Sequence, residues 1–238
     1  MPEISINSYI KLLKNSGISS FLKNEPNNLY EINKIDYNQK SISSISNIKT
    51  IRDLEIFIKN SKTCELKKNA KSTVIGDGNE NSKIMIIGEA PGAEEDKLGK
   101  PFVGAAGMLL NKMLNAINII RENVYITNVV PWRPPNNRTP NNEEIMACLP
   151  FIQKHIEIIN PKLILLLGTT AAKTILNSNL SITKLRGNWH EYKSYNQEEV
   201  SYCLVTYHPA FLLRAPDNKK LSWEDLKLFK KRILDENL

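Results

Sequence analysis

Short apolar runs, in places interrupted by one or two polar residues, alternate from Lys83 onward with stretches of helical spacing. Such runs are typical of strands buried on both faces of a parallel sheet. Four runs fit this description: 84–87, 123–130, 163–167 and 202–206. Helical spacing is found at 104–117, 141–159, 171–176 and 223–234. The alternation predicts an α/β fold, a three-layer αβα arrangement around a central, mostly parallel four-stranded sheet.

The first 60 residues lack this regular alternation. Apolar spacing predicts an amphipathic helix over 5–15 and a second helix over 50–60. Between them, residues 24–47 are rich in Asn, Ser and Lys, which is typical of a linker or a loosely packed segment. We therefore expect an N-terminal extension over 1–60 and one functional domain over 61–238.

Composition and charge fit a soluble globular protein that binds a polyanion. Of the 238 residues, 41% are hydrophobic and 24% are charged. The formal net charge of +7 suits a partner such as nucleic acid. Abundant Lys beside Asn and Ile also fits an AT-rich coding sequence, so charge alone does not decide the partner.

Three cysteines, Cys64, Cys148 and Cys203, are too few and too scattered for a disulfide framework. This usage is typical of a reducing compartment, and we expect a cytoplasmic protein. The first ten residues lack the pattern of a signal peptide, and no apolar run approaches the ~20 residues that cross a bilayer. The sequence therefore predicts no membrane association.

Residues that could carry chemistry follow the predicted strands, at the sheet edge where open α/β folds bind ligands. The segment Gly88–Asp96 is a Gly/Pro loop crowded with carboxylates, directly after the run 84–87. Its glycines allow close backbone approach to a ligand, although a tight turn with solvated acids gives the same pattern. Phe102, between Pro101 and Gly104, could stack on a planar ligand or fold into the core.

Asn128 lies inside the apolar run 123–130, where a buried amide must find hydrogen-bond partners. Its carboxamide matches the Watson–Crick edge of a pyrimidine, and a structural bond to a neighbouring loop is the alternative. The Pro-rich segment that follows carries Arg133 and Arg138. These two residues suit either a rigid loop that contacts a nucleic-acid backbone or a plain surface connector.

His208 follows the run 202–206 almost directly. A histidine on a fixed backbone at this position could stabilise developing negative charge, whereas a lone histidine is often a satisfied core residue. The apolar Phe211, Leu212 and Leu213 stand next to the basic Arg214, and this segment could be a wedge into a base stack. Phe211, Leu212 and Arg214 are the DNA contacts that we expect from it.

In their order along the chain, these motifs resemble the type-4 uracil-DNA glycosylases. The resemblance runs from about Cys64 to the C-terminus, and several ordered motifs are far more specific than any one alone. The segments that carry it are GEAPG with its following acids (88–96), KPFVG (100–104), ITNVV (126–130), RPPNNRTP (133–140), LRGNWH (185–190) and YHPA (207–210).

The resemblance implies a role for each matching residue. Phe102 would stack on an extruded uracil, and Asn128 would bond the O4 and N3 edge of that base. His208 would stabilise the charge that accumulates at O2 as the base leaves. Glu89, with the backbone of its loop from Gly88, would position the attacking water and the base.

Glu95 would narrow the pocket near C5 of the base and so exclude the methyl group of thymine. The implied activity is hydrolysis of the N-glycosidic bond of uracil in DNA after base flipping, as in base excision repair of deaminated cytosine. The expected partner is uracil-containing DNA, and we expect the protein to be a monomer.

The type-4 family usually holds a 4Fe–4S cluster on four cysteines. The corresponding positions here are Ser61, Cys64, Trp132 and Cys148, so two of the four ligands are replaced. Because such a cluster needs four thiolates or close substitutes, we expect no cluster, with Cys64 and Cys148 as remnants of the ligand set.

Two other functions fit the same residues. A protein of this fold could hold uracil-bearing or damaged single strands without turnover, and a glycosylase could act on another deaminated base such as hypoxanthine. A related group traps uracil-DNA covalently through an inserted basic loop with a histidine. Here the segment after Asn128 contains no histidine before His155, which argues against trapping.

Overall fold

The computed structural model describes residues 45–194 and 199–238, which belong to one compact unit that starts at Ser44. The helix expected over 5–15 and most of the linker expected over 24–47 lie outside these residues. Both therefore stay predictions.

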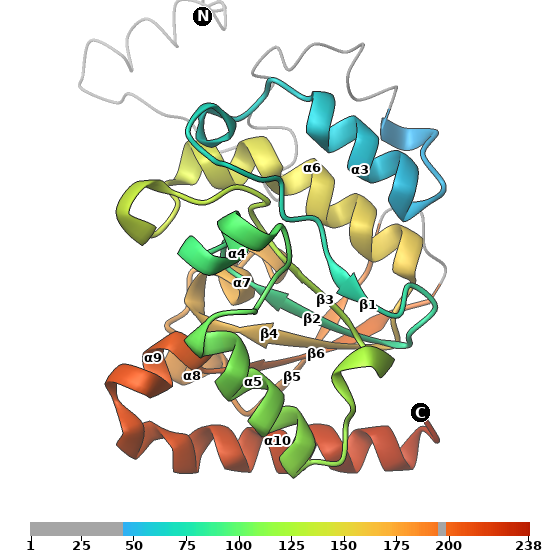
Figure 1. Ribbon diagram of the computed structural model, residues 1–238. Coiled ribbons are helices and arrows are strands. Elements are labelled where there is room, and N and C mark those ends of the chain that lie inside the picture. The colour runs from blue at the N-terminus through green and yellow to red at the C-terminus, as the bar shows by residue number, and fades with distance from the viewer. Residues whose placement is uncertain (1–44, 195–198) are drawn as a thin grey trace, which may run out of the picture. The chain divides into compact units, whose positions relative to one another are not determined.

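One sheet runs through the described unit, with the strand order β1-β3-β2-β4-β6-β5 (Figure 1). The strands are β1 Asp77–Gly78, β2 Ile84–Gly88, β3 Tyr125–Asn128, β4 Leu163–Leu167, β5 Trp189–Tyr192 and β6 Ser201–Thr206. The neighbours β3, β2, β4 and β6 are parallel, whereas β1 and β5 pair antiparallel at the two edges. The expected α/β class is confirmed, but the expected number of four strands is wrong because the sheet has six.

The two edge strands lack the signal that marks the central ones. β1 has only two residues, and the residues of β5 are partly or fully exposed. Neither segment therefore shows an unbroken apolar run, which is what a strand buried on both faces produces.

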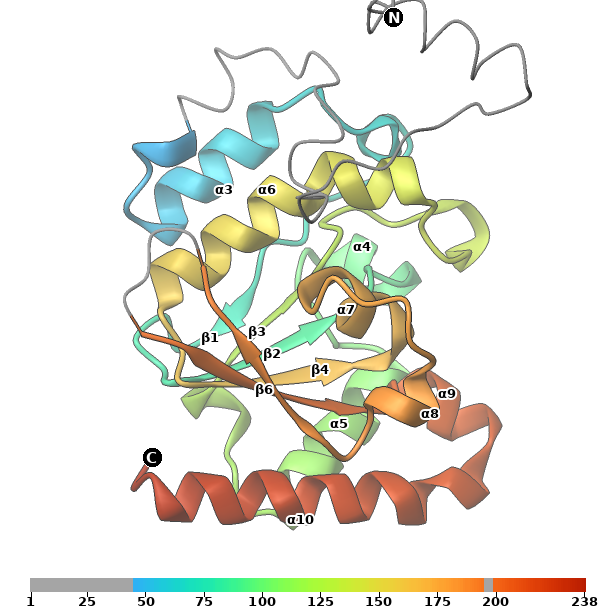
Figure 2. The ribbon, with the colours of Figure 1, turned by 180° about the vertical axis from the view of Figure 1, so that it is seen from behind.

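Helices cover both faces of the sheet (Figures 1 and 2). The first face carries α3 (Ile51–Asn60), α6 (Asn142–Ile159) and α7 (Gly168–Ile175), and the second face carries α5 (Ala105–Ala116) and α10 (Lys219–Asp235). The expected three-layer arrangement is therefore observed. No helix among residues 45–194 and 199–238 has both the length and the apolar character to cross a membrane.

Side-chain alternation along β4 explains how one strand serves two cores. Ile164 and Leu166 belong to the core under α6, and Leu163, Leu165 and Leu167 belong to the core under α5 and α10. All five residues are fully buried, as the continuous apolar run predicts for a central strand.

Shorter helices complete the connections between these elements. They are α4 (Ala93–Leu98), α8 (Ile182–Leu185), α9 (Pro209–Arg214) and the 3-10 turns Glu65–Lys68, Arg121–Asn123, Pro135–Asn137 and Pro216–Asn218. Of these, α4 and α9 lie in the segments that the sequence marks only as loops that could carry chemistry.

Helix α3 is part of the same unit as the sheet. Its Phe57 ring lies 6.2 Å from the Phe151 ring of α6, edge to face, and Leu54 and Ile58 are fully buried. The Lys154 ammonium on α6 also donates to the Ser46 carbonyl at 3.0 Å. The compact unit begins at Ser44, and α3 belongs to it, whereas the sequence pattern places this helix in an extension over 1–60.

The strand register brings the candidate residues to one edge of the sheet. Gly88 at the end of β2 pairs with Asn128 at the end of β3. On the other side, Leu167 at the end of β4 pairs with Thr206 at the end of β6. Because these four strands are parallel, the loops that follow them meet at this edge.

Candidate active site

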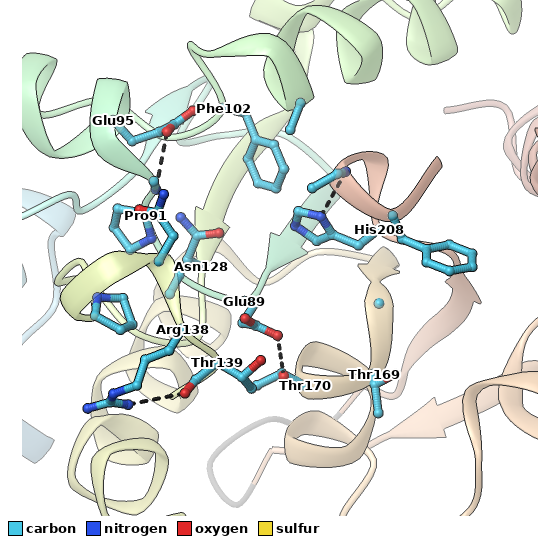
Figure 3. A pocket seen from close by; sticks show the side chains of 18 of the residues that line it. Glu89, Pro91, Glu95, Phe102, Asn128, Arg138, Thr139, Thr169, Thr170 and His208 are labelled. Carbon is cyan, nitrogen blue, oxygen red and sulfur yellow. Dashed lines mark hydrogen bonds between the residues drawn. The ribbon is translucent and has the colours of Figure 1, made fainter. Parts of the chain in front are cut away.

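A cavity of about 730 Å³ lies at the carboxyl ends of the parallel strands (Figure 3). Its lining comes from the loops and helix starts that follow β2, β3, β4 and β6, together with the Phe102 loop and α8. The residues that line it include Glu89, Glu95, Phe102, Asn128, Arg138, Gly168, Thr170, His208, Phe211 and Arg214.

Phe102, Asn128 and His208 line this one cavity, as the sequence predicts (Figure 3). The Phe102 and His208 ring centroids are 5.7 Å apart. Phe102 and Asn128 meet over Gly88, where an added Cβ would lie 2.4 Å from Asn128 Oδ1 and 2.4 Å from Phe102 Cζ. Glycine at 88 is therefore required for the aromatic ring and the amide to occupy their places.

The Asn128 carboxamide is buried but not satisfied. The residue is 5% exposed, and its Oδ1 has no hydrogen-bond partner in the described part of the chain. A buried polar atom without a partner is costly, by about 1–3 kcal/mol, and is rare in folded proteins. The structural alternative, in which Asn128 bonds a neighbouring loop, leaves this acceptor unexplained.

His208 is held in one orientation by its own helix. It is the N-cap of α9, and its Nδ1 accepts from the Ala210 backbone N–H at 3.1 Å. Burial lowers the pKa of His208 to about 4, an effect to which Arg214 adds and which Glu95 opposes. At neutral pH the ring is therefore uncharged, and because Nδ1 accepts, the proton lies on Nε2, which is left as a donor.

The two glutamates of the first loop have different partners. Glu89 accepts a hydrogen bond at Oε2 from the Thr170 hydroxyl, at 2.5 Å (Figure 3). Glu95 accepts at Oε1 from the backbone N–H groups of Val103 and Gly104, at 2.9 and 2.8 Å, and at Oε2 from Gly92 at 3.1 Å. Glu95 therefore ties α4 to the loop that carries Phe102.

The three arginines that the sequence predicts to contact DNA have different partners in the structure. Arg138 makes a two-pronged ion pair with Glu144 at 2.8 and 2.5 Å, so it stiffens the rim of the cavity. Arg214 is exposed and lines the cavity. Arg133 donates to Asn137 within its own loop at 2.7 Å. Contact of these three arginines with DNA stays a prediction.

The three residues of the predicted apolar wedge differ in burial. Leu212 is 1% exposed and packs in the core, which does not favour its predicted contact with DNA. Phe211 is partly buried, with its ring 5.0 Å from the Tyr207 ring. Leu213, the next residue of α9, is 45% exposed and is the apolar side chain of this helix that reaches solvent.

Sequence reasoning missed the segment Gly168–Thr170, which lines the cavity after β4. Thr170 contacts Glu89, and Gly168 lies against His208. The signal was present, because this segment follows the apolar run 163–167 just as Gly88 follows 84–87.

Comparison with known proteins agrees with this geometry. The family model of the Uracil DNA glycosylase superfamily matches residues 75–227. The chain is 44% identical over 182 residues to a type-4 uracil-DNA glycosylase of Thermotoga maritima, covering 75% of this chain and 92% of the relative. It is 46% identical over 171 residues to a type-4 uracil-DNA glycosylase of Sulfurisphaera tokodaii, covering 70% and 77%.

These relatives overturn one expectation. The absence of a cofactor is not supported, because the matched proteins are type-4 enzymes, the family known to carry an iron–sulfur cluster. The positions that the resemblance assigns to its ligands hold Ser61, Cys64, Trp132 and Cys148 in this chain.

The residues at those positions supply two of four thiolates. Cys64 and Cys148 are buried together, and their contact lowers the pKa of the Cys64 thiol. Trp132 is 1% exposed and donates through Nε1 to the Thr73 hydroxyl at 3.1 Å. Within 45–194 and 199–238, no three Cys, His, Asp or Glu side chains gather as metal ligands. This donor set does not fit a four-thiolate cluster.

The matched segment contains every residue placed around the cavity above, from Gly88 to Arg214. Fold, cavity and sequence similarity therefore agree. The chain belongs to the uracil-DNA glycosylase superfamily, within its type-4 group.

Proposed function

We propose that the chain is a monofunctional DNA glycosylase that hydrolyses the N-glycosidic bond of uracil in DNA, in base excision repair of deaminated cytosine. The target nucleotide is flipped out of the stack, and its uracil enters the cavity between Phe102, Asn128 and His208. The bond breaks with charge separation, which leaves an anionic base and an oxocarbenium-like sugar. The chain's task is to stabilise these charges.

The unpartnered carboxamide of Asn128 is the observation that carries this proposal. Uracil offers an acceptor at O4 and a donor at N3, which match the amide N–H and the free Oδ1 of Asn128. The Phe102 ring beside this amide provides a surface on which the base stacks. A pyrimidine in this place would satisfy the buried acceptor that the protein itself leaves without a partner.

His208 would stabilise the leaving base as a neutral donor. Its Nε2–H points toward charge that develops at O2, while the Ala210 amide holds the other ring nitrogen. One such donor typically contributes about 3–4 kcal/mol to transition-state stabilisation. The lowered pKa supports this role, because a neutral imidazole keeps its tautomer and its orientation throughout the reaction.

Glu89 would hold the water that attacks the sugar carbon, and its negative charge would favour the cationic sugar. No Asp follows Glu89 at the position where other glycosylase classes keep a base, so base catalysis contributes little. Glu95 would act through shape, because its carboxylate accepts from three backbone amides and holds the Phe102 loop against the cavity.

We also propose that the protein acts as a monomer in the cytoplasm. One chain supplies every group that the reaction needs. Its cysteines, Cys64, Cys148 and Cys203, are buried free thiols, which suits a reducing compartment.

Incubation with a uracil-containing oligonucleotide, followed by alkaline cleavage of abasic sites, tests the activity. Strand scission at uracil supports the proposal. Retention of the oligonucleotide without scission would instead indicate a binding protein. Scission only at hypoxanthine would indicate a different target base.

Two variants connect the activity to the cavity. His208→Ala and Asn128→Ala should each lose most of the scission while circular dichroism and the thermal unfolding temperature stay close to wild type. Full activity in both variants would move the active site elsewhere.

A further inference from the structure

The first turn of α7, residues 168–170, contacts the two groups that the proposed reaction depends on. It follows β4, which lies between the strand before Glu89 and the strand before His208. Two contacts connect it to both groups.

Thr170 fixes the Glu89 carboxylate. Thr170 is 8% exposed, and its hydroxyl donates to Glu89 Oε2. No other side chain or amide in the described ranges donates to this carboxylate. The Thr170 hydroxyl therefore sets the rotation of the carboxylate and leaves Oε1 available to a water.

Gly168 fixes how closely His208 approaches the turn. Its φ of +87° is a conformation that residues with a side chain rarely adopt. A Cβ at this position would lie 2.9 Å from His208 Cβ, which is closer than real contacts allow. Any larger residue would push the N-cap of α9, and with it the imidazole, away from the cavity.

We propose that Gly168 and Thr170 are positioning residues, which together set the placement of His208 and Glu89 for base departure and water attack. The inference rests on the proposed glycosylase function. The two residues act through other groups, so their effect is on the rate of the chemical step and not on the affinity for DNA. A misplacement of about 1 Å in such a constellation reduces a rate by about a hundredfold.

Thr170→Val tests the hydroxyl, because valine has nearly the same shape and cannot donate. Single-turnover scission of a uracil oligonucleotide should slow about tenfold or more, with little change in the DNA concentration at half-maximal rate. Thr170→Ser keeps the donor and should restore most of the rate. Equal slowing in both variants would overturn the inference, because packing and not the hydrogen bond would then matter.

Thr73→Val is the matched control. The Thr73 hydroxyl accepts from Trp132, so this variant also loses a tertiary hydrogen bond, but it lies outside the residues that line the cavity. It should lower the unfolding temperature and leave the single-turnover rate unchanged. A rate loss equal to that of Thr170→Val would overturn the inference.

Gly168→Ala tests the second contact and should slow scission by about a hundredfold. If this variant does not unfold cooperatively, the Thr170 variants still decide the question. If the wild type is active and Thr170→Val has the wild-type scission rate, only the positioning role is overturned. A wild type without scission at uracil overturns the proposed function as well.

Discussion

Replacing Gly88 by alanine tests the cavity at its most crowded point. The new Cβ would lie 2.4 Å from Asn128 Oδ1 and 2.4 Å from Phe102 Cζ, whereas contacts under 3.4 Å are already tight. Gly88 itself is held by pairing with Asn128 in the sheet, so its backbone cannot retreat. At least one of the two base-binding groups must therefore move by about 1 Å.

The structure gives a magnitude for this change. A misplacement of about 1 Å reduces the rate of the chemical step by about a hundredfold, which corresponds to about 2.7 kcal/mol of barrier. Overpacking of this kind lowers the free energy of unfolding by about 1–3 kcal/mol. Domains of this size are typically stable by about 5–15 kcal/mol, so the variant should still fold.

Single-turnover scission of a uracil oligonucleotide with enzyme in excess measures the chemical step, and thermal unfolding reports the fold. Gly78→Ala is the control, because its Cβ would lie 1.9 Å from the Val124 carbonyl and its φ is +107°. This clash lies at the start of β3, and Asn128 lies at its end. The control should lose stability and keep its rate. A folded Gly88→Ala protein with the wild-type rate would refute the arrangement of Phe102 and Asn128 around one base.

Three further variants probe the rim, the support and the interior of the fold. Leu213→Ala should slow scission in duplex DNA more than in single strands, because this exposed side chain would fill the space that the flipped base leaves in the duplex. Equal slowing on both substrates would count against a wedge. Asp225→Asn leaves Arg186 without its buried countercharge, so it should lower the free energy of unfolding by about 3–5 kcal/mol. Urea denaturation measures this change, and a loss under about 1 kcal/mol would contradict the expectation. Burial lowers the pKa of His155 to about 4, so on acidification this histidine is protonated in the unfolded state before it is protonated in the folded state. His155 should therefore contribute about 3 kcal/mol to the fall in stability as pH decreases from about 6.5 to 4, a range in which His208 also contributes. A His155→Leu variant with the same pH dependence as the wild type would contradict this origin.

The parallel core was predictable because burial on both faces leaves a plain signal. The strands β2 and β4 are unbroken apolar runs, and β3 and β6 are apolar except for a few polar residues. The candidate residues Gly88, Asn128 and His208 were found because each stands at or after the end of such a strand. The edge strands were not predictable in this way. β5 is only half covered, and its pairing with β6 is a tertiary contact that no local pattern records.

Helical phase decides which apolar residue of α9 is buried. Phe211, Leu212 and Leu213 are equally apolar in the sequence, and only the direction of the helix decides which one is buried. That direction follows from His208, which caps α9, and from the packing of Leu212 beside α5 and α10. A short helix of six residues has too few turns to reveal its buried face by periodicity.

Glu89 and Glu95 show most clearly where the sequence stops being sufficient. Both stand in the segment 88–96, six residues apart, and both were assigned to the cavity. The structure gives Glu95 three backbone amides, which fix its carboxylate and make it the clamp of the Phe102 loop. Glu89 receives one hydroxyl, from a turn that lies about 80 residues away in the chain. The chemical difference between the two acids therefore lies in their partners. Those of Glu95 are backbone amides close to it in the chain, whereas the partner of Glu89 is placed only when β4 inserts between β2 and β6.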